Sequence, residues 1–137
     1  MFVFGGWDGA QTLSGLHRFR IRMGHWSDVE INGPLPPHRY RHTSVLFEGN
    51  IFVFGGVDQE HRRFNDLQCF SIANKTWTNI RLNGEIPTRS FHSSVVVDDQ
   101  MFVLGGYDGV NRLNDIHQCS LRPAKPEPEE DMSDVEV

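Results

Sequence analysis

Residues 87–108 read PTRSFHSSVVVDDQMFVLGGYD, and residues 37–58 read PHRYRHTSVLFEGNIFVFGGVD. The two stretches start fifty residues apart and agree at 10 of 22 positions. A third copy of their last eight residues, MFVFGGWD, occupies residues 1–8, fifty residues earlier again. Self-similarity at a fixed period is the signature of architectures that repeat one supersecondary unit. The chain therefore contains three related units, and the structure of one unit decides the fold.

Each unit reads as short β-strands. Runs rich in Phe, Val, Ile and Trp are broken by Gly, Asn, Asp and Pro, and no segment has a helical period. We expect four strands in a complete unit, which we call a to d. The segment after each Gly-Gly pair has nine residues in the middle unit and eight in the others, so it is a loop. The predicted strands are 42–47 and 92–97 (a); 1–4, 51–54 and 101–104 (b); 16–21, 66–72 and 115–121 (c); and 26–31 and 76–82 (d).

These motifs resemble Kelch repeats, which carry Arg-x-x-His-Ser on strand a, Gly-Gly after strand b, Asp before strand c and Trp on strand d. The run 107–115 also looks similar to leucine-zipper-like regulators and Rab9-effector-type Kelch proteins. The resemblance covers residues 1–121 and implies an all-β propeller in which each repeat is one four-stranded antiparallel blade. The first unit departs from the family pattern at Gly15, where the other units have Asp.

The resemblance divides the chain into a partial blade at 1–31, a complete blade at 39–82 and a partial blade at 89–121. Closed propellers use about four to eight blades. We therefore expect a partial Kelch β-propeller of two to three blades, with a ring that this chain alone does not close. Met1 occupies the position of Ile51 and Met101, so we expect an internal methionine read as a start, or a truncated product. Open blade edges would expose unpaired backbone groups and favour self-association.

Charge is unevenly distributed along the chain. Residues 1–121 carry a net charge of −1, whereas residues 122–137 carry −4 and three prolines. Such a segment cannot bury enough apolar surface to fold alone, and we expect a disordered acidic tail. Ser133 lies in an acidic Ser-Asp-Val-Glu context that suits phosphorylation. The tail either keeps the chain in solution or folds back onto basic residues of the body.

Composition excludes several classes of protein. No apolar run approaches the ~18 residues of a membrane span, and the first residues do not read as a signal peptide. Two cysteines, Cys69 and Cys119, are too few for a disulfide scaffold or a CxxC zinc site. These features predict a reducing compartment, the cytoplasm or the nucleus. The total charge of −5 argues against a nucleic-acid partner.

Residues that recur in each unit are interpreted as structural, because a residue needed in every blade serves the blade. A phosphate-cradling role for the glycine pairs would need the Gly-x-Gly-x-x-Gly spacing, which is absent. Metal binding by the paired histidines, or ligand stacking on the tryptophans, is the alternative reading. The structural set is Gly5, Gly6, Gly55, Gly56, Gly105, Gly106, Arg39, Arg89, His42, His92, Asp66, Asp115, Trp26 and Trp77.

One end of the blades is the candidate binding surface. Because strands alternate in direction, the b–c loops and the d-to-a connections share one end, which we call the loop face. It gathers aromatic residues and arginines, the types enriched at binding hot spots; the alternative is a solvated rim. The predicted partner-binding residues are Trp7, His38, Arg41, His61, Arg62, Arg63, Phe64, Tyr107, Asn111 and Arg112.

The sequence thus predicts a non-catalytic protein-interaction module whose loop face binds a protein or acidic peptide through its arginines. The Kelch resemblance implies three finer roles within a longer protein: a Cullin-3 ubiquitin-ligase adaptor, an actin-associated scaffold or a vesicle-trafficking effector. A fragment of a Kelch-fold enzyme is the alternative. A Kelch-type copper oxidase would need a Tyr–Cys pair with Tyr and His ligands, but the chain has only Tyr40 and Tyr107. The Glu-x-x-x-Asp-x-x-x-His motif of iron-dependent specifier proteins is absent. No cofactor or metal is predicted.

Overall fold

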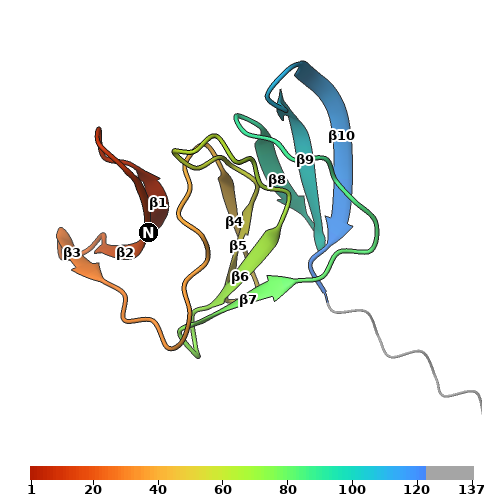
Figure 1. Cartoon of the computed structure of the whole chain (residues 1–137). Coiled ribbons are helices and arrows are strands. Elements are labelled where there is room, and N and C mark those ends of the chain that lie inside the picture. The colour runs from red at the N-terminus through yellow and green to blue at the C-terminus, as the bar shows by residue number, and fades with distance from the viewer. Residues whose placement is uncertain (123–137) are drawn as a thin grey trace, which may run out of the picture.

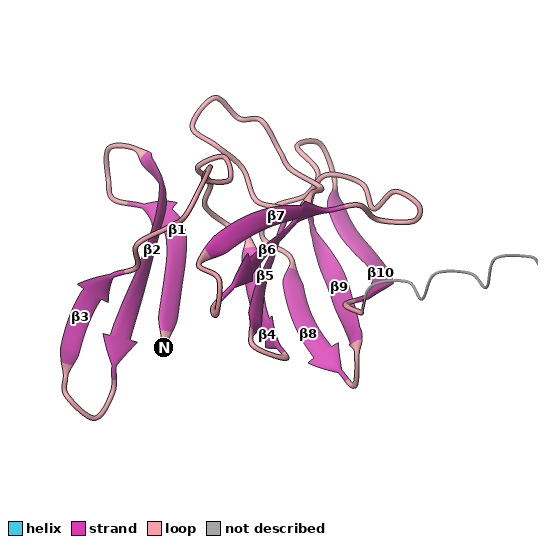
Figure 2. Cartoon of the chain, turned by 90° about the horizontal axis from the view of Figure 1, so that it is seen from below, coloured by secondary structure: helices cyan, strands magenta, loops and turns pink. Residues whose placement is uncertain are grey.

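The computed structural model describes residues 1–122, and over them the fold is all-β, in three antiparallel sheets that do not close into a barrel (Figures 1 and 2). The predicted all-β partial propeller is confirmed. No helix in this part of the chain is long and apolar enough to cross a membrane. The predicted tail from residue 123 onward, including Ser133, lies outside the described residues.

The sheets follow one another along the chain. The first has the order β1-β2-β3, the second β4-β5-β6-β7 and the third β10-β9-β8. The strands are β1 (Phe2–Trp7), β2 (Thr12–Arg20), β3 (His25–Asp28), β4 (Thr43–Phe47), β5 (Asn50–Phe54), β6 (Leu67–Ser71), β7 (Thr76–Ile80), β8 (Ser93–Val97), β9 (Gln100–Tyr107) and β10 (Arg112–Ser120).

The core lies in the two seams between neighbouring sheets. Successive strand residues point to opposite faces of a sheet. In β5, Ile51 and Val53 therefore join the cluster shared with the first sheet, whereas Phe52 and Phe54 join the cluster shared with the third. This two-sided burial explains why residues 51–54 of β5 are all apolar. The outer face of the third sheet instead exposes apolar side chains, such as Val95, which is 56% accessible.

The strands before the Gly-Gly pairs differ from the prediction. Strand β1 continues through its glycines to Trp7, and β9 continues through its own to Tyr107. In both sheets the pairing register shifts at this point, which marks a β-bulge. The bulge lets the strand pass through glycines with positive φ instead of ending before them. Only the middle sheet ends its strand before the pair, at Phe54.

The two tryptophans that the repeat aligns have different surroundings. The Trp77 ring is 9% exposed and packs across a seam against Phe4, with ring centroids 4.8 Å apart. Trp26 is 49% exposed and contacts Phe19 of its own sheet, at 4.9 Å. Within the described residues Trp26 therefore does not pack between two sheets, and its role in packing between blades stays a prediction. The physical reason is position, because within residues 1–122 no sheet precedes that of Trp26.

Candidate functional site

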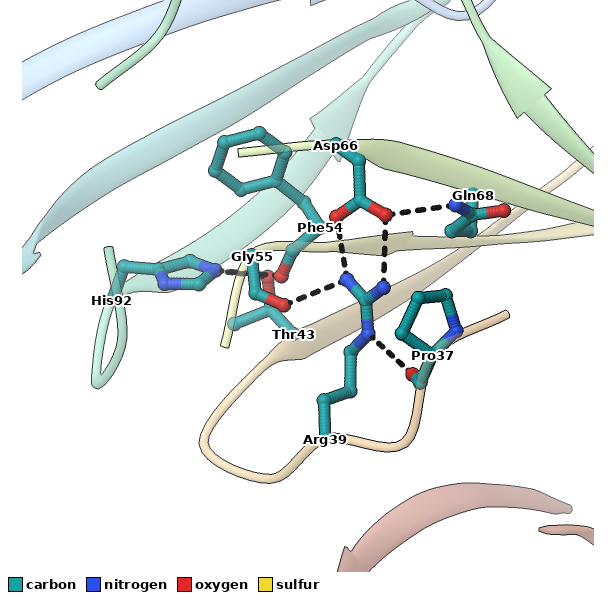
Figure 3. Close-up of polar contacts among 8 residues, drawn as sticks. All are labelled: Pro37, Arg39, Thr43, Phe54, Gly55, Asp66, Gln68 and His92. Atoms are coloured by element: carbon teal, nitrogen blue, oxygen red, sulfur yellow. Dashed lines mark hydrogen bonds and ion pairs between the residues drawn. The ribbon is translucent and has the colours of Figure 1, made fainter. Parts of the chain in front are cut away.

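The loop face is supported from below by a buried arginine. Arg39 is 0% exposed, and its Nη1 and Nη2 donate to the two carboxylate oxygens of Asp66, at 2.6 and 2.8 Å (Figure 3). Its Nη1 and Nε also donate to the carbonyl oxygens of Gly55 and Pro37. Burial raises the pKa of Asp66, but the hydrogen bonds and charge of Arg39 outweigh it and hold that pKa below its ordinary value. The charge of Arg39 is thus neutralised inside the protein by Asp66.

The third sheet repeats this arrangement. Arg89 is also 0% exposed and donates to Asp115 at 2.7 and 2.9 Å and to the carbonyl oxygen of Gly105 at 2.9 Å. The Arg89 hydrogen bond holds the pKa of Asp115 far below its usual range. His117 adds a second contact to the same carboxylate, at 2.8 Å. Both arginines fix the connection that enters a blade, and neither is free to bind a partner.

The repeated histidines lie in the seams. The His42 ring meets Phe4 edge-on at 5.3 Å. His92 Nε2 donates to the carbonyl oxygen of Phe54 at 3.1 Å and lies 2.8 Å from the Thr43 hydroxyl. Burial lowers the pKa of both histidines to about 4, so both are neutral near pH 7 and serve packing. Among the described residues, no three His, Cys, Asp or Glu side chains gather as metal ligands.

An aspartate shapes each b–c loop. The Asp8 carboxylate accepts from the backbone amides of Ala10 and Gln11, both at 2.8 Å. Asp108 does the same with the amides two and three residues onward, at 2.8 and 2.6 Å. These backbone hydrogen bonds lower the pKa of both carboxyls. The aspartates therefore form turns and add little free negative charge to the face.

The middle loop uses its extra residue to bind an arginine internally. Asp58 is 1% exposed and accepts from the Arg62 backbone amide at 2.9 Å and from its Nε at 2.6 Å. Burial raises the pKa of Asp58, but these contacts outweigh it and the pKa is lowered. Glu60 lies 3.6 Å from the same guanidinium. Arg62, a predicted partner-binding residue, is thus already paired.

Arg41 is an exposed arginine whose guanidinium contacts two aromatic rings. Its guanidinium carbon lies 4.5 Å from the Tyr40 ring centroid and 4.2 Å from that of Phe91. The Phe91 amide donates to the Arg41 carbonyl oxygen at 3.1 Å, which joins the second and third sheets. Both residues have positive φ, 58° and 61°, an uncommon conformation for side chains of this size. No carboxylate pairs with Arg41 within residues 1–122.

Two further arginines surround Tyr107. The guanidinium carbon of Arg63 lies 5.0 Å from the Tyr107 ring centroid. Arg112 pairs with Tyr107 in the β9–β10 register and is exposed. Phe91, Tyr107 and Arg112 line one hollow of about 590 Å³ together with Gly106 and a leucine. This group, Arg41, Arg63, Phe91, Tyr107 and Arg112, is called the arginine–aromatic cluster below.

The other predicted residues lie apart from this cluster. Trp7 stacks on Tyr40 at 5.7 Å and extends the aromatic surface over the first sheet. The His38 ring is hydrogen-bonded to the Thr12 hydroxyl in the first seam. Phe64 lies under the buried Arg39 guanidinium, 4.2 Å from it, and is therefore supporting structure. His61 and Asn111 are exposed on their loops.

Sequence reasoning missed Phe91 and Tyr40. Phe91 is 59% exposed although it lies between residues that are buried. It occupies the repeat position of Arg41, fifty residues later. The signal in the sequence is an aromatic residue in a polar connection, aligned with an arginine of the neighbouring unit. It could have revealed the contact between Phe91 and Arg41.

Comparison with known proteins matches residues 1–128 to the KLHDC2/KLHL20/DRC7 Kelch-repeats domain. The chain is 34% identical over 128 residues, 88% of its length, to the leucine-zipper-like transcriptional regulator 1 homolog of Drosophila melanogaster. It is 33% identical over 56% of its length to the human regulator of that name, and 34% identical over 64% to the bovine Rab9 effector protein with kelch motifs. It spans 13%, 10% and 24% of these relatives. The chain belongs to the Kelch-repeat family.

Proposed function

We propose that the chain is a protein-interaction module whose loop face binds a partner protein or peptide at the arginine–aromatic cluster. The observation that carries the proposal is Arg41, charged, exposed and held between two aromatic rings without a carboxylate partner among the described residues. Its guanidinium is positioned before a partner arrives, so little conformational freedom is lost on binding. Arginine and aromatic residues are the usual anchors of protein interfaces.

The cluster favours a partner segment that carries carboxylates. Arg41, Arg63 and Arg112 offer planar guanidinium groups that can bind carboxylates in a bidentate manner. The aspartates of the surrounding loops are engaged with backbone amides or with Arg62, so they compete little for these arginines. Arg62 is withdrawn from the binding set that the sequence predicted.

A non-catalytic role is part of this proposal. The regulator and effector relatives support it. The repeated histidines, which would be the natural bases, are neutral and packed in the seams. A cytoplasmic location is likewise proposed, in keeping with the Rab9 effector relative.

Three finer roles are part of the proposal. The Rab9 effector relative supports a vesicle-trafficking effector, and the family resemblance supports a Cullin-3 substrate adaptor. An actin-associated scaffold rests on the same resemblance. Self-association through free sheet edges, such as that of β1, is a further proposal that sedimentation of the purified chain would test.

Site-specific photo-crosslinking tests the binding surface. A photoreactive phenylalanine analogue replaces Phe91 in one protein and Val97 in another. These two apolar side chains have similar exposure, 59% and 53%. Phe91 precedes β8 at the loop end, and Val97 ends β8 at the opposite end. We expect discrete protein adducts from position 91 alone, reduced when Arg41→Glu is added. Equal adducts from both positions, or adducts that Arg41→Glu leaves unchanged, would contradict the proposal.

A further inference from the structure

The β2–β3 hairpin of the first sheet concentrates positive charge at the end opposite the loop face. Residues 17–28 read HRFRIRMGHWSD and contain Arg18, Arg20 and Arg22 at alternating positions. The turn between the two strands lies at the lower end of the first sheet in Figure 2, away from the long loops. The other turns at this end are acidic or mixed, which makes the hairpin distinct.

The strand register brings the basic residues onto one face. Arg18 lies opposite Ser27, and Arg20 lies opposite His25, in the β2–β3 pairing. Residues two apart on a strand share a face, so these four side chains project on the same side of the hairpin. Leu16 precedes Arg18 on that side and is buried against the second sheet. The four residues therefore lie where the seam opens to solvent.

A hollow of about 570 Å³ lies over these side chains. It is lined by Arg18, Arg20, Met23, His25, Ser27 and Asp28.

Two polar atoms of the lining are buried and have no hydrogen-bond partner within residues 1–122. They are Arg18 Nε and Ser27 Oγ, and the strand register places their residues opposite each other. A buried donor without an acceptor is costly. Both residues line the hollow, so these unsatisfied groups lie at its wall, beside the place where an acceptor ligand would bind.

The charge of the hollow is not neutralised by the protein itself. Within the described residues, neither Arg18 nor Arg20 forms an ion pair. The one acidic residue of the lining, Asp28, has its carboxylate 2.7 Å from His17 Nδ1. The lining thus offers two guanidinium groups, an imidazole and a hydroxyl against a single acid that is already engaged.

We propose that this hollow is a phosphate-binding site, formed by Arg18, Arg20, His25 and Ser27. Arginine binds phosphate through two parallel hydrogen bonds, and a tetrahedral group has enough acceptor oxygens for all four side chains. A planar carboxylate has only two oxygens and leaves more of these donors unsatisfied. The inference does not depend on the proposed function, because the hairpin lies at the other end of the blades.

The test titrates inorganic phosphate into the full chain at constant ionic strength, with chloride as the balancing anion. Binding is followed by the NMR shifts of backbone amides in residues 17–28. We expect a saturating response, which Arg20→Gln weakens by about tenfold and Ser27→Ala by about threefold, as the loss of one charge-assisted or neutral hydrogen bond would produce. Arg20 is exposed, so its replacement leaves the fold intact.

Arg81→Gln is the matched control, because Arg81 is also exposed and unpaired within residues 1–122 but follows β7 of the second sheet. It should leave phosphate affinity unchanged. A second arm replaces free phosphate with phosphatidylcholine vesicles, with or without a phosphoinositide. Arg20-dependent binding in either arm supports the site and identifies the source of the phosphate. Shifts that do not saturate, equal losses in Arg20→Gln and Arg81→Gln, or binding in neither arm would overturn it.

Discussion

Replacing Asp66 with alanine tests whether the buried arginine of the second sheet, Arg39, is held by its carboxylate. The substitution removes both short contacts to Arg39, at 2.6 and 2.8 Å, and leaves that guanidinium 0% exposed with only carbonyl oxygens as acceptors. Breaking a buried ion pair from one side costs about 3–5 kcal/mol, because the remaining charge is uncompensated. Domains of this size are stable by about 5–15 kcal/mol. We therefore expect Asp66→Ala to lose a large part of the free energy of unfolding.

Urea denaturation followed by circular dichroism measures the loss. Glu85→Ala is the control, since Glu85 is exposed and forms no ion pair among the described residues; it should cost no more than about 0.5 kcal/mol. The double variant Arg39→Met, Asp66→Leu removes both charges, and we expect it to be more stable than Asp66→Ala. A loss below about 1 kcal/mol for Asp66→Ala, or a double variant less stable than the single one, would show that the carboxylate does not hold Arg39.

Three further perturbations examine the seams. Burial lowers the pKa of His92 to about 4 in the folded state, so the unfolded chain binds this proton first as the pH falls from about 6.5 to 4. Up to roughly 3 kcal/mol of the free energy of unfolding should be lost in that pH range. His92→Asn should flatten the dependence of this free energy on pH, measured by denaturation. Gly55→Ala places a Cβ 2.7 Å from His92 Cε1 at a φ of 67°, and thermal unfolding should show it to be at least about 1 kcal/mol less stable than Gly49→Ala, where φ is also positive but no atom lies within 4 Å. Trp77→Ala should cost about 3–5 kcal/mol in urea and Trp26→Ala much less, because only the first ring is buried; equal costs would contradict the seam described above.

The repeat predicted more than the fold class. Equivalent positions of neighbouring units meet across a seam, so the fifty-residue period also predicts contacts. Arg41 and Phe91 are fifty residues apart and stack at 4.2 Å. Thr43 and Ser94, one residue beyond that spacing, bring their hydroxyl oxygens to 2.6 Å. The period identifies the equivalent positions, and the local φ, which directs each side chain, decides which of those pairs touch.

The loop face was the less predictable part. The sequence identified the loops by their variable length, but it treated every arginine on them as available. Arg62 is neutralised by an aspartate four residues earlier, and only the nine-residue loop makes that contact. Arg41 is the stronger candidate, because its guanidinium contacts two rings, from the connections that precede β4 and β8. Availability of a charge depends on tertiary contacts that composition does not contain.

Position in the array changes what a repeated residue does. Trp26 and Trp77 align in the sequence, yet only the second lies between two sheets of the chain. The alternation of arginines in residues 17–28 has no counterpart in the other units. The repeat therefore predicts a residue's strand and face well, and its neighbours only where a second sheet is present.

Hydrogen–deuterium exchange shows most directly whether the loop face is the binding surface. It is measured on the chain alone and with the purified protein that the crosslinking identifies. We expect slower exchange in the segments 40–41, 61–64, 88–91 and 107–112, with little change in the β4–β5 and β8–β9 turns at the other end. Protection confined to those turns, with unchanged exchange in the loop segments, would contradict it.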